Sequence, residues 1–301
     1  MPDQTVTKSI SSAQLDAFQV LVISGKDRVE FLQGQLTQDI TKLDNAGTAL
    51  AGWASAKGRL LATGQLIAAD DEIWWPLPTD IIEIVAKRLQ MFVLRSAVKI
   101  VISTAPISGL FGVEGNDQLE IAGKSASIQS RVNQITDGSL FVRVVGDPDR
   151  AWLIGPAAEA TGLESAEESA WIRQSIHTGL PYIVAATQEL FVPQMLNLDL
   201  IDAISFNKGC YVGQEIVART QNLGRIKRRM YRFSVNNNSM QLSPGTGIYG
   251  PDNSTGKVVL CSDDELLAVV PIESSTGPWY ADKDMTITLE SRSLPYSISA
   301  Q

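Results

Sequence analysis

Residues 205–219 read Ser-Phe-Asn-Lys-Gly-Cys-Tyr-Val-Gly-Gln-Glu-Ile-Val-Ala-Arg, and the interpretation of the whole chain starts from this stretch. Within eight positions it contains a lysine, a cysteine, two glycines and a glutamine–glutamate pair. Glycines on both sides of a reactive side chain predict a backbone that bends sharply and lets a ligand approach closely. The residues from Gln214 onward favour a short helix that ends near Gly224, because glycine commonly follows the last helical turn.

Cys210 would then lie just ahead of a helix N-terminus, with Lys208 only two residues away. A helix N-terminus and a neighbouring cation both stabilise the thiolate form of a cysteine. The alternative interpretation is that Cys210 is a small buried apolar residue, as most free cysteines are. We predict a reactive thiol, because all the local features favour the thiolate.

The composition of the 301-residue chain is that of an ordinary globular protein, with 44% hydrophobic and 19% charged residues. Its length suits one large or two moderate domains around a buried core. The net charge of −8 argues against general nucleic-acid binding, and so against a direct DNA partner. No apolar run approaches the ~20 residues of a membrane span, and the N-terminus lacks a secretory signal. We therefore expect a cytoplasmic protein that does not associate with membranes.

The small number of metal-binding side chains excludes several chemistries. The chain holds two cysteines, Cys210 and Cys261, and one histidine, His177. These cannot build a zinc site of four such ligands or a four-cysteine iron–sulfur cluster, and we expect no resident metal. A cysteine–histidine hydrolase would need His177 beside Cys210, for which the sequence gives no support. The chain also lacks a Gly-x-x-x-x-Gly-Lys-Ser/Thr nucleotide-binding loop.

The N-terminal part, residues 1–225, mixes β-rich runs with amphipathic helices and predicts an α+β domain. The expected strands cover residues 15–23, 50–54, 60–68, 72–77, 98–102 and 107–113, with a hairpin at 139–154. One helix should begin near Lys26 and bury Val29, Leu32, Leu36 and Ile40. A second should begin at Thr79 and bury Ile82, Val85, Leu89 and Phe92. A third should open with a capping box from Ser165 to Glu168, run through Trp171 and end at Gly179.

Residues 226–301 form a second expected domain. Short β-runs separated by glycine and proline predict a small antiparallel barrel. A run of basic residues lies at the junction of the two domains: Arg219, Arg225, Lys227, Arg228, Arg229 and Arg232. We interpret it as a local patch for a phosphate or a polyglutamate tail. The alternative is a solvated strand edge, which charged residues commonly protect.

Residues 208–215, Lys-Gly-Cys-Tyr-Val-Gly-Gln-Glu, resemble the Lys-Gly-Cys-Tyr-x-Gly-Gln-Glu signature of the YgfZ family without a gap. Residues 31–39 and the Pro-Gln-x-x-Asn-Leu block at 193–198 resemble further parts of that family. The resemblance implies an aminomethyltransferase-like, folate-binding body around a central cavity, with the signature at its rim and a C-terminal β-barrel. It also implies that Cys210 is the reactive thiol and that Lys208 holds the thiolate or an anion. The loop would be supported by Gly209, Tyr211, Gly213, Gln214, Glu215 and Arg219.

The resemblance further implies tetrahydrofolate or a derivative as cofactor, with its pterin flanked by Phe18 and Trp171. This sequence departs from the family pattern at two positions. Ser55 stands where relatives usually have an aspartate, and His177 stands where folate-binding relatives often have a glutamate. A neutral imidazole offers one donor and one acceptor, so it cannot chelate the amino edge of a pterin as a carboxylate would. The alternative interpretation is that His177 has a purely structural role.

The function implied by the resemblance is an accessory factor for iron–sulfur cluster assembly or repair that supports iron–sulfur-dependent tRNA modification. Its partners would be a reduced folate and iron–sulfur assembly or client proteins, and we expect a monomer. The alternative is a folate-dependent aminomethyl or methyl transferase, which Ser55 and His177 make less suitable. A pure tRNA-binding module would need a broader basic face than residues 219–232 supply.

Overall fold

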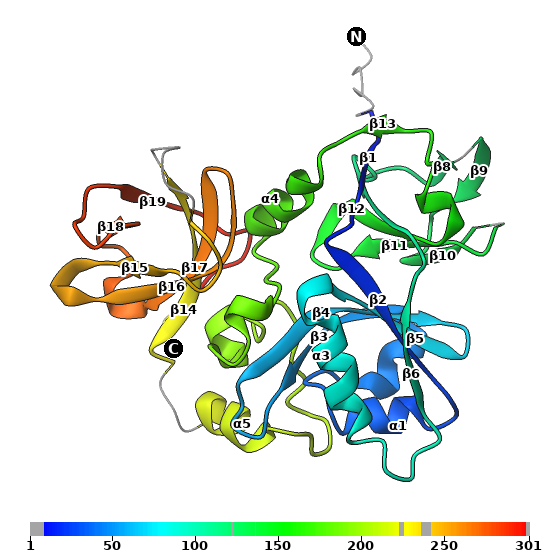
Figure 1. Cartoon of the computed structure of the whole chain (residues 1–301), viewed down its shortest axis with the longest axis horizontal. Helices are drawn as coiled ribbons and strands as arrows, with labels where there is room; N and C mark the ends of the chain where they lie inside the picture. Colours follow the sequence, from blue (N-terminus) through cyan, green and yellow to red (C-terminus); the bar gives the residue numbers. More distant parts are fainter. Residues whose placement is uncertain (1–8, 122, 136, 223–225, 236–241, 299–301) are drawn as a thin grey trace.

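The computed structural model describes residues 9–121, 123–135, 137–222, 226–235 and 242–298. Three larger β-structures organise the described chain: a five-stranded sheet, a six-stranded sheet and a closed barrel. Figure 1 shows the two sheets one above the other, with the barrel beside them and a helix, α4 (Glu168–Thr178), between the upper sheet and the barrel. No helix in the described part of the chain is long and apolar enough to cross a membrane.

The five-stranded sheet has the order β3-β4-β5-β2-β6, and all its neighbouring strands are antiparallel. Its strands are β2 (Phe18–Ser24), β3 (Thr48–Ala54), β4 (Leu60–Ala69), β5 (Glu72–Pro78) and β6 (Lys99–Ser103). The predicted strands and the predicted β3–β4 turn are confirmed. Gly58 adopts a φ of +68° in that turn, as a tight hairpin requires.

Helix α3 (Thr79–Gln90) packs on this sheet through a stripe of side chains spaced three to four residues apart. The buried residues are Ile81, Ile82, Val85 and Leu89. Burying each such side chain stabilises the fold by roughly 1.5–3 kcal/mol. The prediction that Phe92 joins this stripe is wrong: the helix ends at Gln90, and Phe92 is 40% exposed.

Helix α1 (Arg28–Gln33) is shorter than the predicted helix, which extended to Ile40. Gly34 ends it, and Leu36 instead forms an isolated β-bridge with Trp53. Leu32, Leu36 and Ile40 are all buried, so the apolar pattern correctly identified core residues but not the conformation that buries them. Two short helical segments follow, a 3₁₀ turn at Ile40–Lys42 and α2 at Leu43–Ala46.

The six-stranded sheet has the order β10-β11-β12-β7-β1-β13. Its strands are β1 (Ser11–Gln14), β7 (Ile107–Phe111), β10 (Val132–Gln134), β11 (Leu140–Val144), β12 (Asp147–Ile154) and β13 (Glu164–Ser165). A separate hairpin pairs β8 (Gln118–Ile121) with β9 (Lys124–Ser127). The predicted Ser165–Glu168 capping box does not form, because Ser165 belongs to β13 and the Glu168 carboxylate accepts from the Ala17 amide at 2.7 Å. Gly179 ends α4 in the left-handed region, as predicted.

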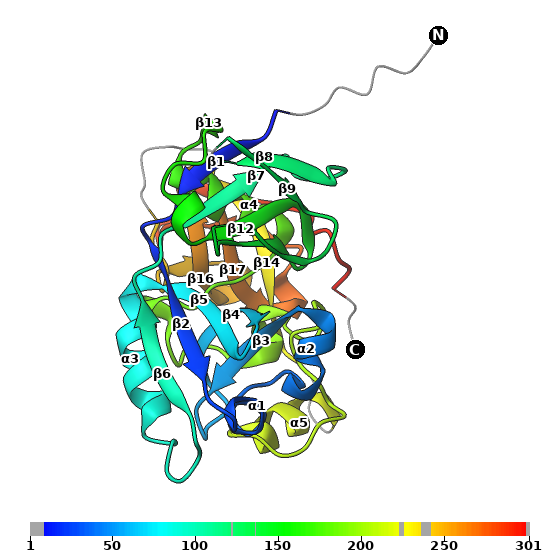
Figure 2. The ribbon, with the colours of Figure 1, turned by 90° about the vertical axis from the view of Figure 1, so that its right-hand side faces the viewer.

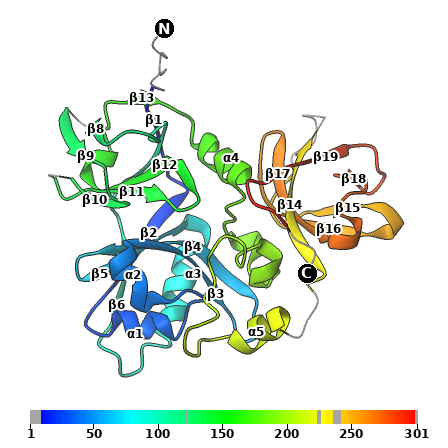
Figure 3. The ribbon, with the colours of Figure 1, turned by 180° about the vertical axis from the view of Figure 1, so that it is seen from behind.

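The predicted barrel is confirmed as a closed structure of the order β14-β17-β16-β15-β18-β19. Its strands are β14 (Arg228–Val235), β15 (Gly247–Tyr249), β16 (Thr255–Ser262), β17 (Glu265–Pro271), β18 (Trp279–Tyr280) and β19 (Thr288–Arg292). Phe233 and Trp279 fill its centre, with their ring centroids 6.5 Å apart. Helix α5 (Gln214–Asn222) precedes it and begins where the sequence predicts. Figure 3 shows α5 below β3, between the five-stranded sheet and the barrel.

The predicted basic patch is wrong for two of its members. Arg229 is buried and forms a bidentate ion pair with Asp199, at 2.6 and 2.8 Å. Arg232 pairs with Glu265 at 2.6 Å. These two guanidinium groups therefore hold the barrel together and to the body rather than facing a ligand. Arg225 lies outside the described residues, while Lys227 and Arg228 remain near the surface.

Candidate functional site

A polar cleft of about 440 Å³ opens beside β3. It is lined by the stretch after α1, by the first half of β3 and by residues 202–207, which run into the signature sequence, together with Arg131 beside β10 and Val145 beside β11. The residues that line it include Gln38, Asp39, Lys42, Leu50, Arg131, Asp202, Ile204, Ser205, Phe206 and Asn207. Its volume lies within the ~300–1,000 Å³ range of small-molecule sites.

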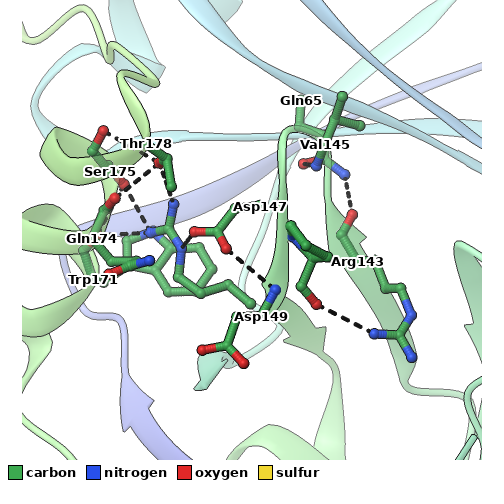
Figure 4. A network of polar contacts seen from close by, with 11 residues as sticks. Gln65, Arg143, Val145, Asp147, Asp149, Trp171, Gln174, Ser175 and Thr178 are labelled. Atoms are coloured by element: carbon green, nitrogen blue, oxygen red, sulfur yellow. Dashed lines mark hydrogen bonds and ion pairs between the residues drawn. The ribbon is translucent and has the colours of Figure 1, made fainter. Parts of the chain in front are cut away.

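A second, almost closed cavity of about 20 Å³ lies behind the cleft, and Leu50 lines both. Trp152, Leu180 and Tyr182 contribute much of its apolar wall. Gln65, one of its polar residues, is satisfied: its side chain bonds the Arg143 carbonyl oxygen and the Val145 amide (Figure 4), and also the Thr48 hydroxyl. A cavity of this size holds about one water molecule. The inner cavity would have to widen before it could hold a pterin ring.

Lys208 fastens the signature loop, residues 205–213, to the body. Its ammonium donates hydrogen bonds of 2.7 Å to the carbonyl oxygens of both Leu36 and Gln38, and lies 5.0 Å from the Tyr211 ring centroid. Burial lowers the pKa of Lys208 to about 8, against the opposing attraction of Asp39. We predicted that Lys208 holds the Cys210 thiolate or an anion, but in the structure its ammonium bonds two backbone carbonyl oxygens instead. The lysine serves as a latch between the loop and the segment after α1.

The C-terminal end of the loop packs on the β3–β4 turn through glycine. Gly213 adopts a φ of +81°, and a Cβ there would stand 2.5 Å from the Ser55 carbonyl oxygen. Gly58 lies equally close to Ile216, where a Cβ would stand 2.7 Å from the Ile216 side chain. Gln214 then begins α5 and accepts from the Tyr211 amide at 3.2 Å, while its own amide bonds the Tyr211 carbonyl oxygen. These reciprocal bonds fix the entry into α5 as a capping box does.

The two cysteines occupy different environments. Cys210 is exposed on the signature loop, four residues before α5 begins. Cys261 is half-buried at the end of β16, donates to the Leu242 carbonyl oxygen at 3.0 Å, and has its pKa raised by burial. Burial keeps a thiol protonated and unreactive. Exposure therefore favours Cys210 over Cys261 as the accessible thiol.

The two aromatic residues assigned to the pterin are not brought together. Phe18 and Trp171 are both buried, and Trp152 contacts each of them edge-on, at centroid distances of 5.4 and 4.4 Å respectively. An open slot between Phe18 and Trp171 is therefore absent from this part of the structure. Trp152 is the member of this cluster that lines the inner cavity, together with Tyr182, which also packs edge-on against Phe18.

Arg150 supports this aromatic cluster from inside the fold, and Figure 4 labels its partners Asp147, Trp171 and Ser175. Its guanidinium is fully buried, pairs with Asp147 at 2.7 Å and lies 4.4 Å from the Trp171 ring centroid. It also donates to the Trp171 carbonyl oxygen and the Ser175 hydroxyl, at 2.8 and 2.9 Å. Sequence reasoning missed both Arg150 and Trp152. An arginine three residues after an aspartate, at the start of an apolar run, was the one available signal.

The remaining predicted site residues lie away from the cleft or serve the loop. His177 Nε2 is 2.6 Å from the Glu265 carboxylate of the barrel, so it is a structural contact between α4 and β17. Glu215 and Arg219 form an exposed ion pair one turn apart on α5. Gly209 has open space around it, and Tyr211 is buried, which raises its pKa to about 12. Ser55 is buried under the loop.

Comparisons with known proteins were consistent with this architecture. The fold is similar to the crystal structure of aminomethyltransferase T of the glycine cleavage system from Bartonella henselae. That match has a TM-score of 0.73 and 14% identity, and it covers 95% of this chain and 86% of that one. At this identity the likeness shows the fold alone. No family model matches the chain.

The sequence itself is similar to curated proteins named "tRNA-modifying protein YgfZ". The protein from Colwellia psychrerythraea is 31% identical over 235 residues, which cover 72% of this chain and 69% of that protein. The one from Yersinia pseudotuberculosis serotype O:1b is 29% identical over 235 residues, covering 74% and 70%. The chain thus has an aminomethyltransferase-like fold, with a cleft that the signature loop borders. By its sequence, the chain belongs to the YgfZ family.

Proposed function

We propose that this protein is a folate-binding accessory factor that supports iron–sulfur cluster assembly or repair, and thereby the tRNA modification for which its relatives are named. One observation carries the proposal. The loop that lines the cleft with residues 205–207 continues directly to the exposed Cys210, and is fixed on either side of it by Lys208 and Gly213. An exposed thiol therefore lies three residues along the chain from Asn207, which lines the ligand-sized cleft.

The residues of the cleft fit a reduced folate. Phe206, 44% exposed, offers a flat apolar face for a ring, while Lys42 and Arg131 offer cations for the carboxylates of the glutamate tail. Behind the cleft, the buried Trp152 indole N–H has no acceptor among the described residues. A buried donor without a partner is costly, so it suits a ligand that brings an acceptor. We place the pterin toward this inner cavity.

In this arrangement Phe18 and Trp171 act indirectly. Both pack against Trp152, and so they hold in place the aromatic residue that faces the cavity. When bound, tetrahydrofolate supplies one-carbon and redox chemistry. The chain's own residues bind it, orient it and exclude water behind Leu50. The inner cavity must open for the pterin to enter, because its present volume of about 20 Å³ is too small.

Cys210 alone cannot hold an iron–sulfur cluster, which normally takes four cysteine ligands. The other cysteine, Cys261, lies on the barrel and is engaged with Leu242. A cluster would therefore meet this protein as cargo, contacted by Cys210 while other ligands come from a partner protein. This single exposed thiol supports a role in transfer or repair.

The folate part of the proposal is tested by calorimetric titration with tetrahydrofolate. We expect binding to the wild type, and clearly weaker binding for Trp152→Phe, which keeps the ring but loses the indole donor. Leu190→Ala, a change at a 38% exposed leucine outside the cleft, is the matched control and should bind as the wild type does. The absence of heat at millimolar tetrahydrofolate would remove folate from the account.

The alternative, a folate-dependent transferase, has one observation in its favour: the carboxylates of Asp39 and Asp202 line the cleft. Hydrogen bonds from Thr41, with those from Lys42 and Gln33, lower the pKa of Asp39 against the effect of its burial. A carboxylate with a lowered pKa is a weak general base, so this observation favours binding over catalysis. Formation of methylene-tetrahydrofolate from tetrahydrofolate and an aminomethyl-lipoyl protein, with release of ammonia and the dihydrolipoyl protein, would reverse that judgement.

A further inference from the structure

A group of apolar side chains is exposed at the end of α3 and in the turn that follows it. Leu94 is 86% exposed, Met91 66%, Ile84 53% and Phe92 40%. We call this surface the α3–β6 tip and define it by Ile84, Lys87, Met91, Phe92, Leu94 and Arg95. Figures 1 and 2 both show the turn between α3 and β6 projecting at the lower end of the molecule. Several large apolar side chains exposed on one turn indicate an interaction site.

The turn is held in a defined conformation. The Ala97 amide donates to the Asp27 carboxylate at 2.6 Å, and the Ala97 carbonyl oxygen accepts from the Asp27 amide at 3.4 Å. Backbone bonds from Phe92 to Leu89 and from Val93 to Gln90 continue the helical path past the end of α3. The root of the turn is thus fixed, and Leu94 is presented outward. Such preorganisation reduces the entropy lost on binding.

The residues of the tip itself carry positive charge in an acidic chain, and the neighbouring carboxylates include those of Glu83, just before Ile84, and Asp27, which bonds Ala97 at the root of the turn. Between Ile84 and Val113 the sequence has four basic residues and no acidic one, while the whole chain carries −8. Arg88 is the one of these four that pairs with an acid in the described structure, at 3.7 Å from Glu189. Lys87 and Arg95 are exposed next to the apolar side chains. The tip is therefore an apolar surface flanked by cations.

We propose that the α3–β6 tip docks a partner protein whose contact face has apolar side chains surrounded by aspartates and glutamates. Charge complementarity selects an acidic partner. RNA would satisfy the cations but not the aliphatic side chains, since nucleic-acid interfaces are polar. An anionic membrane fits less well, because Lys87 lies between Ile84 and Met91 on one face of α3. Inserting that face would bury its charge.

The tip also lies at the same end of the molecule as the signature loop. Helix α1 connects them: Asp27, just before α1, holds Ala97 of the turn, and Leu36, just after it, accepts from Lys208. Figures 1 and 2 show the turn, α1 and α5 together at the lower end. A partner seated on the tip is placed on the side of the molecule that carries Cys210. This last link rests on the proposed function, whereas the docking surface does not.

The test is photo-cross-linking in cells with p-benzoylphenylalanine in place of Leu94, followed by identification and purification of the linked protein. Its affinity for the full chain is then measured by titration. We expect an acidic protein that binds at least tenfold more weakly to the double variant Lys87→Glu/Arg95→Glu and to Leu94→Asp. Leu190→Asp, a similar change at another exposed leucine, is the control and should bind as the wild type does.

Several outcomes would overturn the proposal. These are no adduct at all, a nuclease-sensitive adduct, an adduct at twice the mass of the chain, and an affinity indifferent to charge reversal. Binding of vesicles of phosphatidylcholine and phosphatidylglycerol that Leu94→Asp abolishes would show that the occupant is a membrane. None of the residues that define the tip lines the folate cleft, so the tip variants should bind tetrahydrofolate normally. Failure of docking is thereby distinguished from failure of the proposed function.

Discussion

Gly213 lies so close to Ser55 that a Cβ at position 213 would stand 2.5 Å from the Ser55 carbonyl oxygen. The contact is glycine against backbone, so it has no flexible side chain that can move aside. It joins the signature loop to the β3–β4 turn at the point where α5 begins. The position of Cys210 three residues earlier depends on this contact at one side and on the Lys208 latch at the other.

Gly213→Ala should therefore displace the loop. The left-handed φ of +81° alone costs a non-glycine residue roughly 1–2 kcal/mol, and the clash with Ser55 adds to it. Gly209→Ala is the matched control, because a Cβ there meets nothing within 4 Å. Urea unfolding of both variants checks the prediction. Equal stability of the two would mean that the loop does not pack on the turn as described.

The Lys208 latch predicts a particular pH dependence. In the folded protein the pKa of Lys208 is about 8, below the ordinary value of 10.5. Between these two values the unfolded chain holds a proton that the folded protein has released, so the free energy of unfolding rises with pH. Lys208→Met should lack this rise. Urea unfolding of both proteins from about pH 7.5 to about pH 10 measures it, and parallel pH profiles would contradict it.

Arg150 should be among the most sensitive positions for stability. Its ion pair with Asp147 is buried, with the two side chains 0% and 3% exposed, so Arg150→Met leaves an unpaired carboxylate inside the fold. Removing one partner of a buried pair costs about 3–5 kcal/mol. The control is Arg173→Met, which breaks an exposed pair with Asp263 and should cost about 1 kcal/mol or less. Chemical unfolding compares them, and similar losses would contradict the account.

Truncation of Trp171 should be tested for its effect on stability rather than on folate binding. As a pterin-facing residue it would tolerate truncation, but it is fully buried, and Trp171→Ala should cost about 3–5 kcal/mol. Loss of folate binding in that variant would be ambiguous, because the cluster around Trp152 would collapse with it. Trp152→Phe is the informative change, since it removes one donor while it keeps the ring. A thermal melt of Trp171→Ala that matches the wild type would show that the cluster is not core.

The sequence predicted the regular elements well because their signals are local. The strands of the five-stranded sheet, the start of α5 and the end of α4 at Gly179 follow from alternation and from glycine. The length of α1 did not follow, since the helix ends at Gly34 and Leu36, whose amide still bonds the Leu32 carbonyl oxygen, forms a β-bridge with Trp53 of β3. The capping box at Ser165 failed for a similar reason: Glu168 bonds Ala17 instead.

The candidate site was only partly predictable. The signature residues were identified correctly as a loop before a helix, but Lys208 was assigned to the thiolate, whereas its partners are carbonyl oxygens 170 residues or more away in sequence. The basic run was predicted to be a charged surface because its neighbours along the chain are basic, whereas Arg229 forms a buried ion pair with Asp199, which is distant in sequence. Such tertiary partners leave no local pattern. The aromatic cluster shows the same limit, because Trp152 separates the two rings that the resemblance paired.

The central claim, that the exposed thiol of Cys210 carries the function, is tested most directly by complementation. A strain that lacks this protein is supplied with the wild type, Cys210→Ser or Cys261→Ser, and iron–sulfur-dependent tRNA thiomethylation is quantified by mass spectrometry. Each substitution removes one sulfur with little change in volume, so both proteins should fold. We predict that Cys261→Ser restores the modification and Cys210→Ser does not. Full restoration by Cys210→Ser would contradict the account.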